Sequence, residues 1–229
     1  TKKAIINLDK FYLNKDISFE TTNIKDGYFT VNGEKIDING CLRTDSTNNK
    51  YEIFSPSILA NEIKASVDLR GYLSNSIENQ GRIGSCVANA ITTAIEYLAS
   101  RKTKKEVDMS RLFLYYIARK ITDSDELGEG CNIYTALKNA QSLGVCMEKT
   151  WPYLIDNTDL SPPSFAYLEA EKFKIESFQN IKAELNNMLS CLSEGYPFVF
   201  GIRLFESFNS NNNGVIPVPK KGELVSSEH

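Results

Sequence analysis

A cysteine, Cys86, stands directly before a run of residues with helical spacing, and a glutamine, Gln80, lies six positions before it. The apolar residues up to Ser100 recur on one helical face, so the sequence predicts a helix that begins at Cys86. Unpaired N–H groups at a helix N-terminus favour an anionic sulfur, and the thiolate is the reactive form of cysteine. The amide of Gln80 can donate to an oxyanion that forms beside this sulfur. These residue types therefore predict a nucleophilic cysteine with an amide donor.

A cysteine nucleophile needs a general base, and the sequence contains one histidine, His229. It follows a strand-like apolar run at 196–203, a polar segment at 209–214 and a short apolar stretch. As the base, His229 would hold Cys86 as a thiolate–imidazolium pair and would then protonate the leaving amine.

Residues 80–88 read Gln-Gly-x-x-Gly-Ser-Cys-x-Ala and resemble the nucleophile segment of the papain-like (cathepsin-like, C1 family) cysteine peptidases. The resemblance implies that Cys86 is the nucleophile and that Gln80 forms the oxyanion hole with the backbone N–H of Cys86. It also implies that His229 is the catalytic histidine, because the two residues are separated by roughly 130–150 positions in that family. An Asn that orients the imidazole is expected beyond His229.

Two positions of the segment depart from the family pattern. Ile83 stands where the family often has another cysteine, and Val87 stands where it usually has tryptophan. The disulfide common in that loop is therefore not expected here.

The resemblance covers residues 67–229. Three further segments carry it: residues 67–70 (Val-Asp-Leu-Arg), residues 130–137, and residues 144–153, which contain Trp-Pro-Tyr. In the family, the backbone of a loop that leads into a short helix binds the substrate in extended form. The segment 130–137 corresponds to this loop. The resemblance thus assigns substrate binding to Gly84 and Ser85 in the nucleophile segment and to Gly130 and Cys131 in this loop.

The predicted fold class is α+β, with two halves and an active-site cleft between them. Residues 67–175 form a helical half led by the Cys86 helix, with further helices expected at 110–122 and 133–142. Residues 176–229 form an antiparallel, barrel-like β half that begins with a helix at 181–193. This half is expected to be incomplete at its C-terminal end, with the remaining strands supplied by a continuation of the same gene product.

Residues 1–66 match no part of the mature enzyme of the family. Residues 28–38 alternate around Asn32-Gly33, which predicts a β-hairpin. The position of this block favours an atypical pro-segment that holds the enzyme as a zymogen. The alternative is a structural extension without an inhibitory role.

The five cysteines form no Cys-x-x-Cys pair, and one histidine cannot complete the usual structural zinc sets, so no metal and no cofactor are expected. With Cys86 as the nucleophile, three pairings of the other four into disulfides remain open: Cys41, Cys131, Cys146 and Cys191. Cys41 and Cys131 are expected in loops, available for oxidation, and Cys146 and Cys191 are expected to be buried.

The net charge of −3 does not indicate a basic surface for binding nucleic acid. No apolar run approaches the roughly 18 residues that span a membrane. The expected partner is a polypeptide substrate, together with a C-terminal fragment of the same gene product. No targeting segment is apparent, and lysosomal or vacuolar, secreted and virion-associated locations all stay open. Two alternatives to a cysteine endopeptidase remain: an inactive papain-like binding protein, and another Cys–His acyl-transfer enzyme such as a transglutaminase or amidase.

Overall fold

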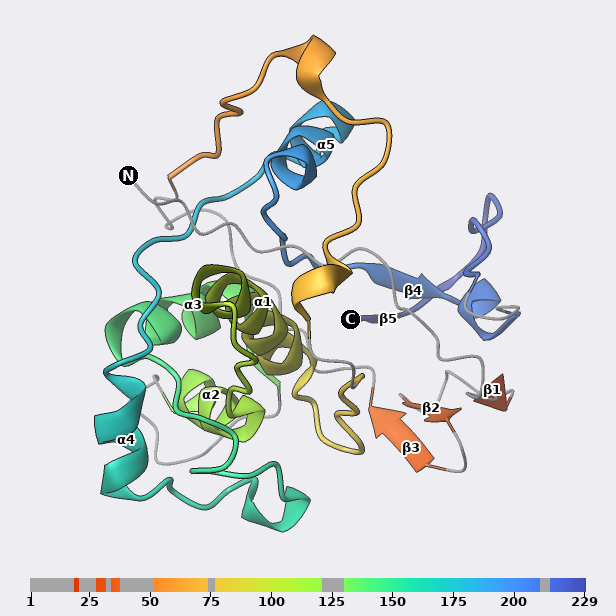
Figure 1. Cartoon of the computed structure of the whole chain (residues 1–229). Coiled ribbons are helices and arrows are strands. Elements are labelled where there is room, and N and C mark those ends of the chain that lie inside the picture. Colours follow the sequence, from red (N-terminus) through yellow and green to blue (C-terminus); the bar gives the residue numbers. More distant parts are fainter. Residues whose placement is uncertain are drawn as a thin grey trace.

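A computed structural model of the chain describes residues 19–20, 28–31, 34–37, 52–73, 77–120, 130–210 and 215–229. Figure 1 shows α1 to α4 gathered on one side of the molecule, with α5, β4 and β5 on the other. The fold is α+β, as predicted. Short 3₁₀ helices connect the main elements at Ala60–Glu62, Arg70–Tyr72, Ile155–Asn157 and Glu206–Ser210.

Three helices build the core of the helical half, and all three were predicted: α1 (Cys86–Thr103), α2 (Arg111–Arg119) and α3 (Ile133–Ser142). Each of them contacts the other two, and their buried faces form the main hydrophobic cluster. Side chains cap two of the helices, since Ser110 accepts from the N–H of Phe113 at 3.1 Å and Asn132 accepts from that of Thr135 at 2.7 Å. The predicted end of the second helix at residue 122 lies outside the described residues.

The helix α4 (Ser164–Ala170) was not predicted. It buries the small residues Ala166 and Ala170, whereas Phe165 and Leu168 are 61% and 65% exposed. The apolar residues that normally reveal a buried face therefore lie on the wrong side of this helix. Small residues allow α4 to approach the chain after α3 closely, and a Cβ on Gly144 would overlap the carbonyl oxygen of Ala170.

The β half has a smaller core of its own, formed by Phe54, Cys191 and Phe198. Its helix α5 (Leu185–Ser193) begins four residues later than the predicted start at 181. The strands β4 (Arg203–Phe205) and β5 (Val225–Glu228) pair antiparallel. The strand expected at 196–203 contributes only its last residues to this ladder.

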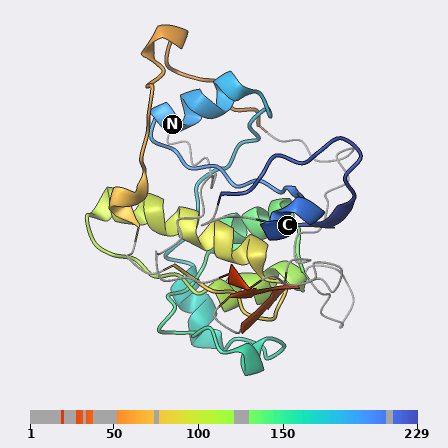
Figure 2. The same ribbon diagram turned by 90° about the vertical axis from the view of Figure 1, so that its right-hand side faces the viewer.

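Residues 52–64, which we call the strap, run along the β half beside α5 (Figures 1 and 2). The strap exchanges two backbone hydrogen bonds of 2.8 Å with Asn180, one from Phe54 and one to Glu52. Further along, both the N–H and the hydroxyl of Ser57 donate to the carboxylate of Glu194, at 2.8 and 2.6 Å. The strap therefore packs with the β half, although it precedes the predicted boundary at residue 66.

The N-terminal hairpin is present. β2 (Tyr28–Val31) pairs antiparallel with β3 (Glu34–Asp37), with Val31 opposite Glu34 as a two-residue connection requires. A short strand β1 (Phe19–Glu20) adds to the edge of β2.

The far end of α1 joins the two halves. Tyr97 Oη donates to the carbonyl of Gly195 at 3.0 Å, and the Arg101 guanidinium donates to the same oxygen. Gly195 has a φ of +81°, and a Cβ there would lie 2.8 Å from the guanidinium. A glycine is thus required where the loop after α5 meets α1. Among the described residues, no helix combines the length and the apolar character needed to cross a membrane.

Candidate active site

Cys86 is the first residue of α1, and its side chain is buried with 8% exposed. The preceding loop turns sharply at Gly81, where φ is +64°, and the Asn79 side chain accepts from the N–H of Gly81 at 2.9 Å. The first turn of α1 carries no acidic residue, so no side-chain charge there offsets the positive end of the helix dipole. A helix N-terminus of this kind is a position at which an anion is favoured.

Gln80 is buried within the same loop. Its Nε2 donates to the carbonyl of Ile83 at 3.2 Å, and this bond orients the amide inside the loop. The sequence prediction placed Gln80 as an oxyanion donor. The described contacts hold its side chain at the start of the loop that ends at Cys86.

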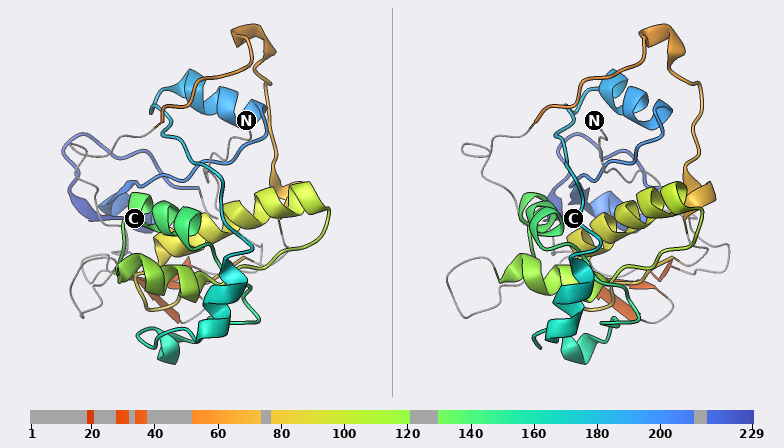
Figure 3. Two further views of the ribbon diagram at one scale, coloured as in Figure 1. Left: turned by 90° about the vertical axis from the view of Figure 1, so that its left-hand side faces the viewer. Right: turned by 60° about the vertical axis from the view of Figure 1, so that its left-hand side comes forward.

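His229 follows β5 and continues its ladder. Its N–H donates to the carbonyl of Ile202 at 2.9 Å, and its carbonyl accepts from the N–H of Ile202 at 2.8 Å. The views in Figures 1, 2 and 3 agree that this end of the chain lies beside the N-terminal end of α1. Pairing with the start of β4 is therefore what carries the chain of His229 toward the helix that begins with Cys86.

The predicted substrate-binding residues lie at two places in the helical half. Ser85 is fully buried, and Gly84 lacks the positive φ that Gly81 has. Gly130 has a φ of +72°, and its N–H donates to the hydroxyl of Tyr115 at 3.2 Å.

The prediction that Cys131 is available for oxidation was wrong. Its side chain is only 3% exposed, because it packs into the same hydrophobic cluster as Cys86 at the start of α3. Loop position in the sequence did not reveal this, since burial depends on the helices that pack over the loop. Cys41 lies outside the described residues.

Two other cysteines are buried free thiols, as predicted: Cys146 and Cys191. Burial raises the pKa of each thiol to about 12. Neither supplies a thiolate near neutral pH. Because every pairing into two disulfides would use both residues, none of the three pairings is formed.

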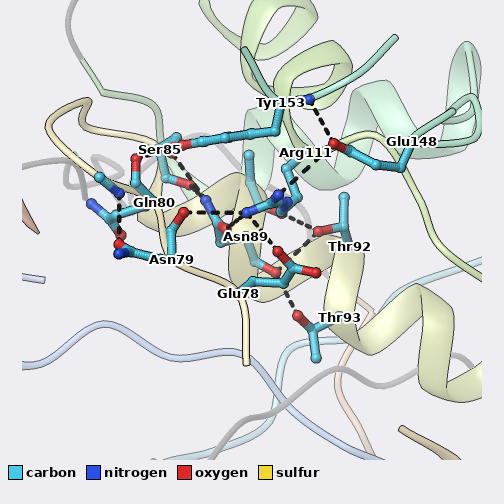
Figure 4. A network of polar contacts seen from close by, with 12 residues as sticks. Glu78, Asn79, Gln80, Ser85, Asn89, Thr92, Thr93, Arg111, Glu148 and Tyr153 are labelled. Atoms are coloured by element: carbon cyan, nitrogen blue, oxygen red, sulfur yellow. Dashed lines mark hydrogen bonds and ion pairs between the residues drawn. The ribbon is translucent and has the colours of Figure 1, made fainter. Parts of the chain in front are cut away.

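An arginine that sequence reasoning missed lies beside the loop that precedes Cys86 (Figure 4). Arg111 has little exposure, and its guanidinium stacks 4.0 Å from the centre of the Tyr153 ring. It forms an ion pair with Glu78 at 2.9 Å and a longer one with Glu148 at 3.8 Å. It also donates to the carbonyl of Asn79 at 3.4 Å. A buried cation paired with two carboxylates thus contacts the loop that precedes Cys86.

One sequence signal could have identified Arg111. It occupies the first turn of a predicted helix, where the dipole disfavours a cation, so local structure gives no reason for it. Such a residue is expected to have acidic partners from elsewhere in the fold. In the described part of the chain, no group of three or more His, Cys, Asp and Glu side chains is arranged to hold a metal ion.

The family described as papain family cysteine protease matches residues 63–228. This chain belongs to the papain family. A curated papain-family relative, an uncharacterized peptidase C1-like protein of Acanthamoeba polyphaga mimivirus, is 33% identical over 163 residues, which are 66% of this chain and 52% of the relative. The chain thus spans about half the length of this relative.

A solved papain-family structure is also similar. Xylellain, a cysteine protease from Xylella fastidiosa, superposes with a TM-score of 0.74 at 29% sequence identity. The match covers 83% of this chain and 76% of xylellain. The papain-like resemblance inferred from residues 80–88 is therefore confirmed at the level of family and fold.

Proposed function

We propose that this papain-family chain is a cysteine peptidase that hydrolyses peptide bonds with Cys86 as nucleophile and His229 as general base. The observation that carries the proposal is the position of Cys86 at the N-terminus of α1, with the amide of Gln80 held in the same loop. The thiolate attacks the scissile carbonyl, and the oxyanion accepts from the backbone N–H of Cys86 and from Gln80. His229 then protonates the leaving amine, and water releases the acyl group.

The second wall of the site comes from the β half. The ladder between His229 and Ile202 positions the histidine backbone, and the side chains of Phe200 and Ile202 are each 39% exposed. We expect further strands, which also supply the orienting Asn, to cover these apolar side chains. These strands and a polypeptide substrate are the partners that the proposal requires.

The N-terminal region enters the proposal as a zymogen segment. Because the strap contributes Phe54 to the core of the β half, a cut near residue 66 would remove part of that core. We therefore place the restraining segment before Glu52, within residues 1–51. A chain shortened to begin at Glu52 should be more active than the full chain and equally stable. Equal activity of the two would favour a structural extension instead.

Labelling with an epoxide inhibitor of thiol proteases tests the nucleophile directly. Mass spectrometry should find one adduct on Cys86, and Cys86→Ala should lose both the adduct and the cleavage of peptide-amide substrates. Ala fits the small buried site, so the variant should fold. Cys146→Ala is the matched control, since it removes another buried cysteine of the same cluster and should keep the adduct. Peptide cleavage by purified Cys86→Ala would refute the assignment, and a protein without adduct or activity would be an inactive binding protein.

A further inference from the structure

A single tyrosine hydroxyl joins the two ends of the loop between Gln80 and Cys86. Tyr153 Oη donates to the backbone carbonyl of Gln80 at 2.8 Å, and it lies 2.5 Å from Oγ of Ser85, the residue directly before the nucleophile. We propose that Tyr153 is a positioning residue that fixes the amide of Gln80 relative to the sulfur of Cys86. This inference rests on the peptidase function proposed above.

The hydroxyl is the last member of a chain of hydrogen bonds with one direction (Figure 4). Arg111 can only donate, and it donates to Oδ1 of Asn89 at 3.2 Å. The Nδ2 of Asn89 donates to Ser85 Oγ at 3.0 Å. Since the Tyr153 proton is used on the Gln80 carbonyl, the Ser85 hydroxyl is the donor to Tyr153. Each bond of such a chain polarises the next, so the chain resists rearrangement.

Both the ring and the backbone of Tyr153 are also held. The Arg111 guanidinium covers the ring, and the Tyr153 N–H donates to Glu148 Oε1 at 2.6 Å. Burial raises the pKa of the Tyr153 hydroxyl, which keeps its proton in place as a donor. The hydroxyl is thus a fixed point of the helical half.

Two features of the loop make this anchor relevant to catalysis. The bond from Gln80 to Ile83 lies within the loop and orients the amide there, whereas Tyr153 connects the loop to the segment after α3. Ser85 is the N-cap residue of α1, yet its side chain makes no capping hydrogen bond. Its hydroxyl bonds to Asn89 and Tyr153 instead. Displacement of a catalytic group by about 1 Å can lower a rate by about 10²-fold, so an anchor on both ends of the loop should affect turnover.

The substitution Tyr153→Phe removes the hydroxyl and keeps the ring against Arg111. We expect kcat on a peptide-amide substrate to fall about 10- to 100-fold, with KM within about twofold, because the loss appears where the oxyanion forms. Alkylation of Cys86 by iodoacetamide forms no oxyanion, so its rate and pH profile should match the wild type. The matched control is Tyr167→Phe, a partly buried tyrosine of α4 that packs on Phe113, which should keep the wild-type kcat.

A double-variant cycle tests whether Tyr153 acts through Gln80. In a Gln80→Ala background the amide is gone, so Tyr153→Phe should lower kcat by less than about threefold further. Ser85→Ala breaks the same chain one step earlier and serves if Tyr153→Phe does not fold, which thermal unfolding will show. The inference is overturned if Tyr153→Phe has the same kcat as Tyr167→Phe. It is also overturned if Tyr153→Phe lowers kcat by the same factor in the Gln80→Ala background as in the wild type. An inactive wild-type chain would overturn the proposed function, and this inference with it.

Discussion

Glu96 should make the stability of the helical half depend on pH. It lies within α1, and its Oε1 accepts from the backbone N–H of Met109 at 2.8 Å. Burial raises the pKa of this carboxyl from 4.5 to about 7, against the opposing effect of the Met109 N–H. The neighbouring carboxylates of Asp108 and Glu78 contribute smaller parts of this rise, and Arg111 opposes it. The carboxyl is therefore held in a place that favours its neutral form.

The sign of the effect follows from this raised pKa. Between pH 4.5 and about 7 the folded protein binds a proton at Glu96 more tightly than the unfolded chain does. The stabilisation is fully present below pH 4.5 and is lost as the pH rises through about 7. A difference of about 2.5 pKa units corresponds to about 3 kcal/mol in the free energy of unfolding.

Urea unfolding of wild type and Glu96→Gln at pH 5 and pH 8 measures this effect. The glutamine keeps an oxygen for the Met109 N–H but cannot ionise, so its stability relative to wild type should rise by about 2 to 3 kcal/mol from pH 5 to pH 8. The quantity to compare is how the difference in free energy of unfolding between Glu96→Gln and wild type changes with pH, because the amide also alters the absolute stability. Glu171→Gln removes an exposed charge and should show no such change. A Glu96→Gln difference that stays constant from pH 5 to pH 8 would refute the reasoning.

Three further substitutions test the site and its supports. Gln80→Ala should lower kcat by about 10²–10³-fold, as for one oxyanion donor, and a kcat equal to wild type would remove Gln80 from the mechanism. Phe54→Ala should reduce the free energy of unfolding by about 3–5 kcal/mol, since the strap supplies this side chain to the small core; a urea midpoint like that of wild type would show that the strap is dispensable. Gly144→Ala should lower the free energy of unfolding by at least about 1–3 kcal/mol, because φ at this position is +86° and the new Cβ would overlap the Ala170 carbonyl. An unchanged melting temperature would contradict this.

Local signals made the nucleophile segment and the helices around it predictable. The start of α1 at Cys86 and both ends of α3 were read from apolar periodicity. The hairpin of β2 and β3 was read from one Asn-Gly pair between alternating residues. In each case the residues that decide the structure lie within a few positions of one another.

The parts that could not be predicted depend on contacts between distant segments. The strap is one example, because nothing near Phe54 in the sequence indicates that it packs with Cys191 and Phe198. The support of the nucleophile loop is another, since Arg111 and Tyr153 come from different elements and meet only in the folded chain. The Trp-Pro-Tyr segment supported the family resemblance, but the role of its tyrosine hydroxyl required the structure.

Burial alone does not decide which cysteine of this chain is reactive. Cys86 is buried, as are Cys146 and Cys191, whose thiols have pKa values raised to about 12. Cys86 and Cys191 also lie at opposite ends of their helices. Cys191 occupies the last turn of α5, where the dipole disfavours an anion and the nearby Glu194 adds a negative charge, whereas Cys86 opens α1 among N–H groups that favour one. Because the N–H groups at a helix N-terminus favour an anion, we expect reagents for thiolates to select Cys86 over Cys191.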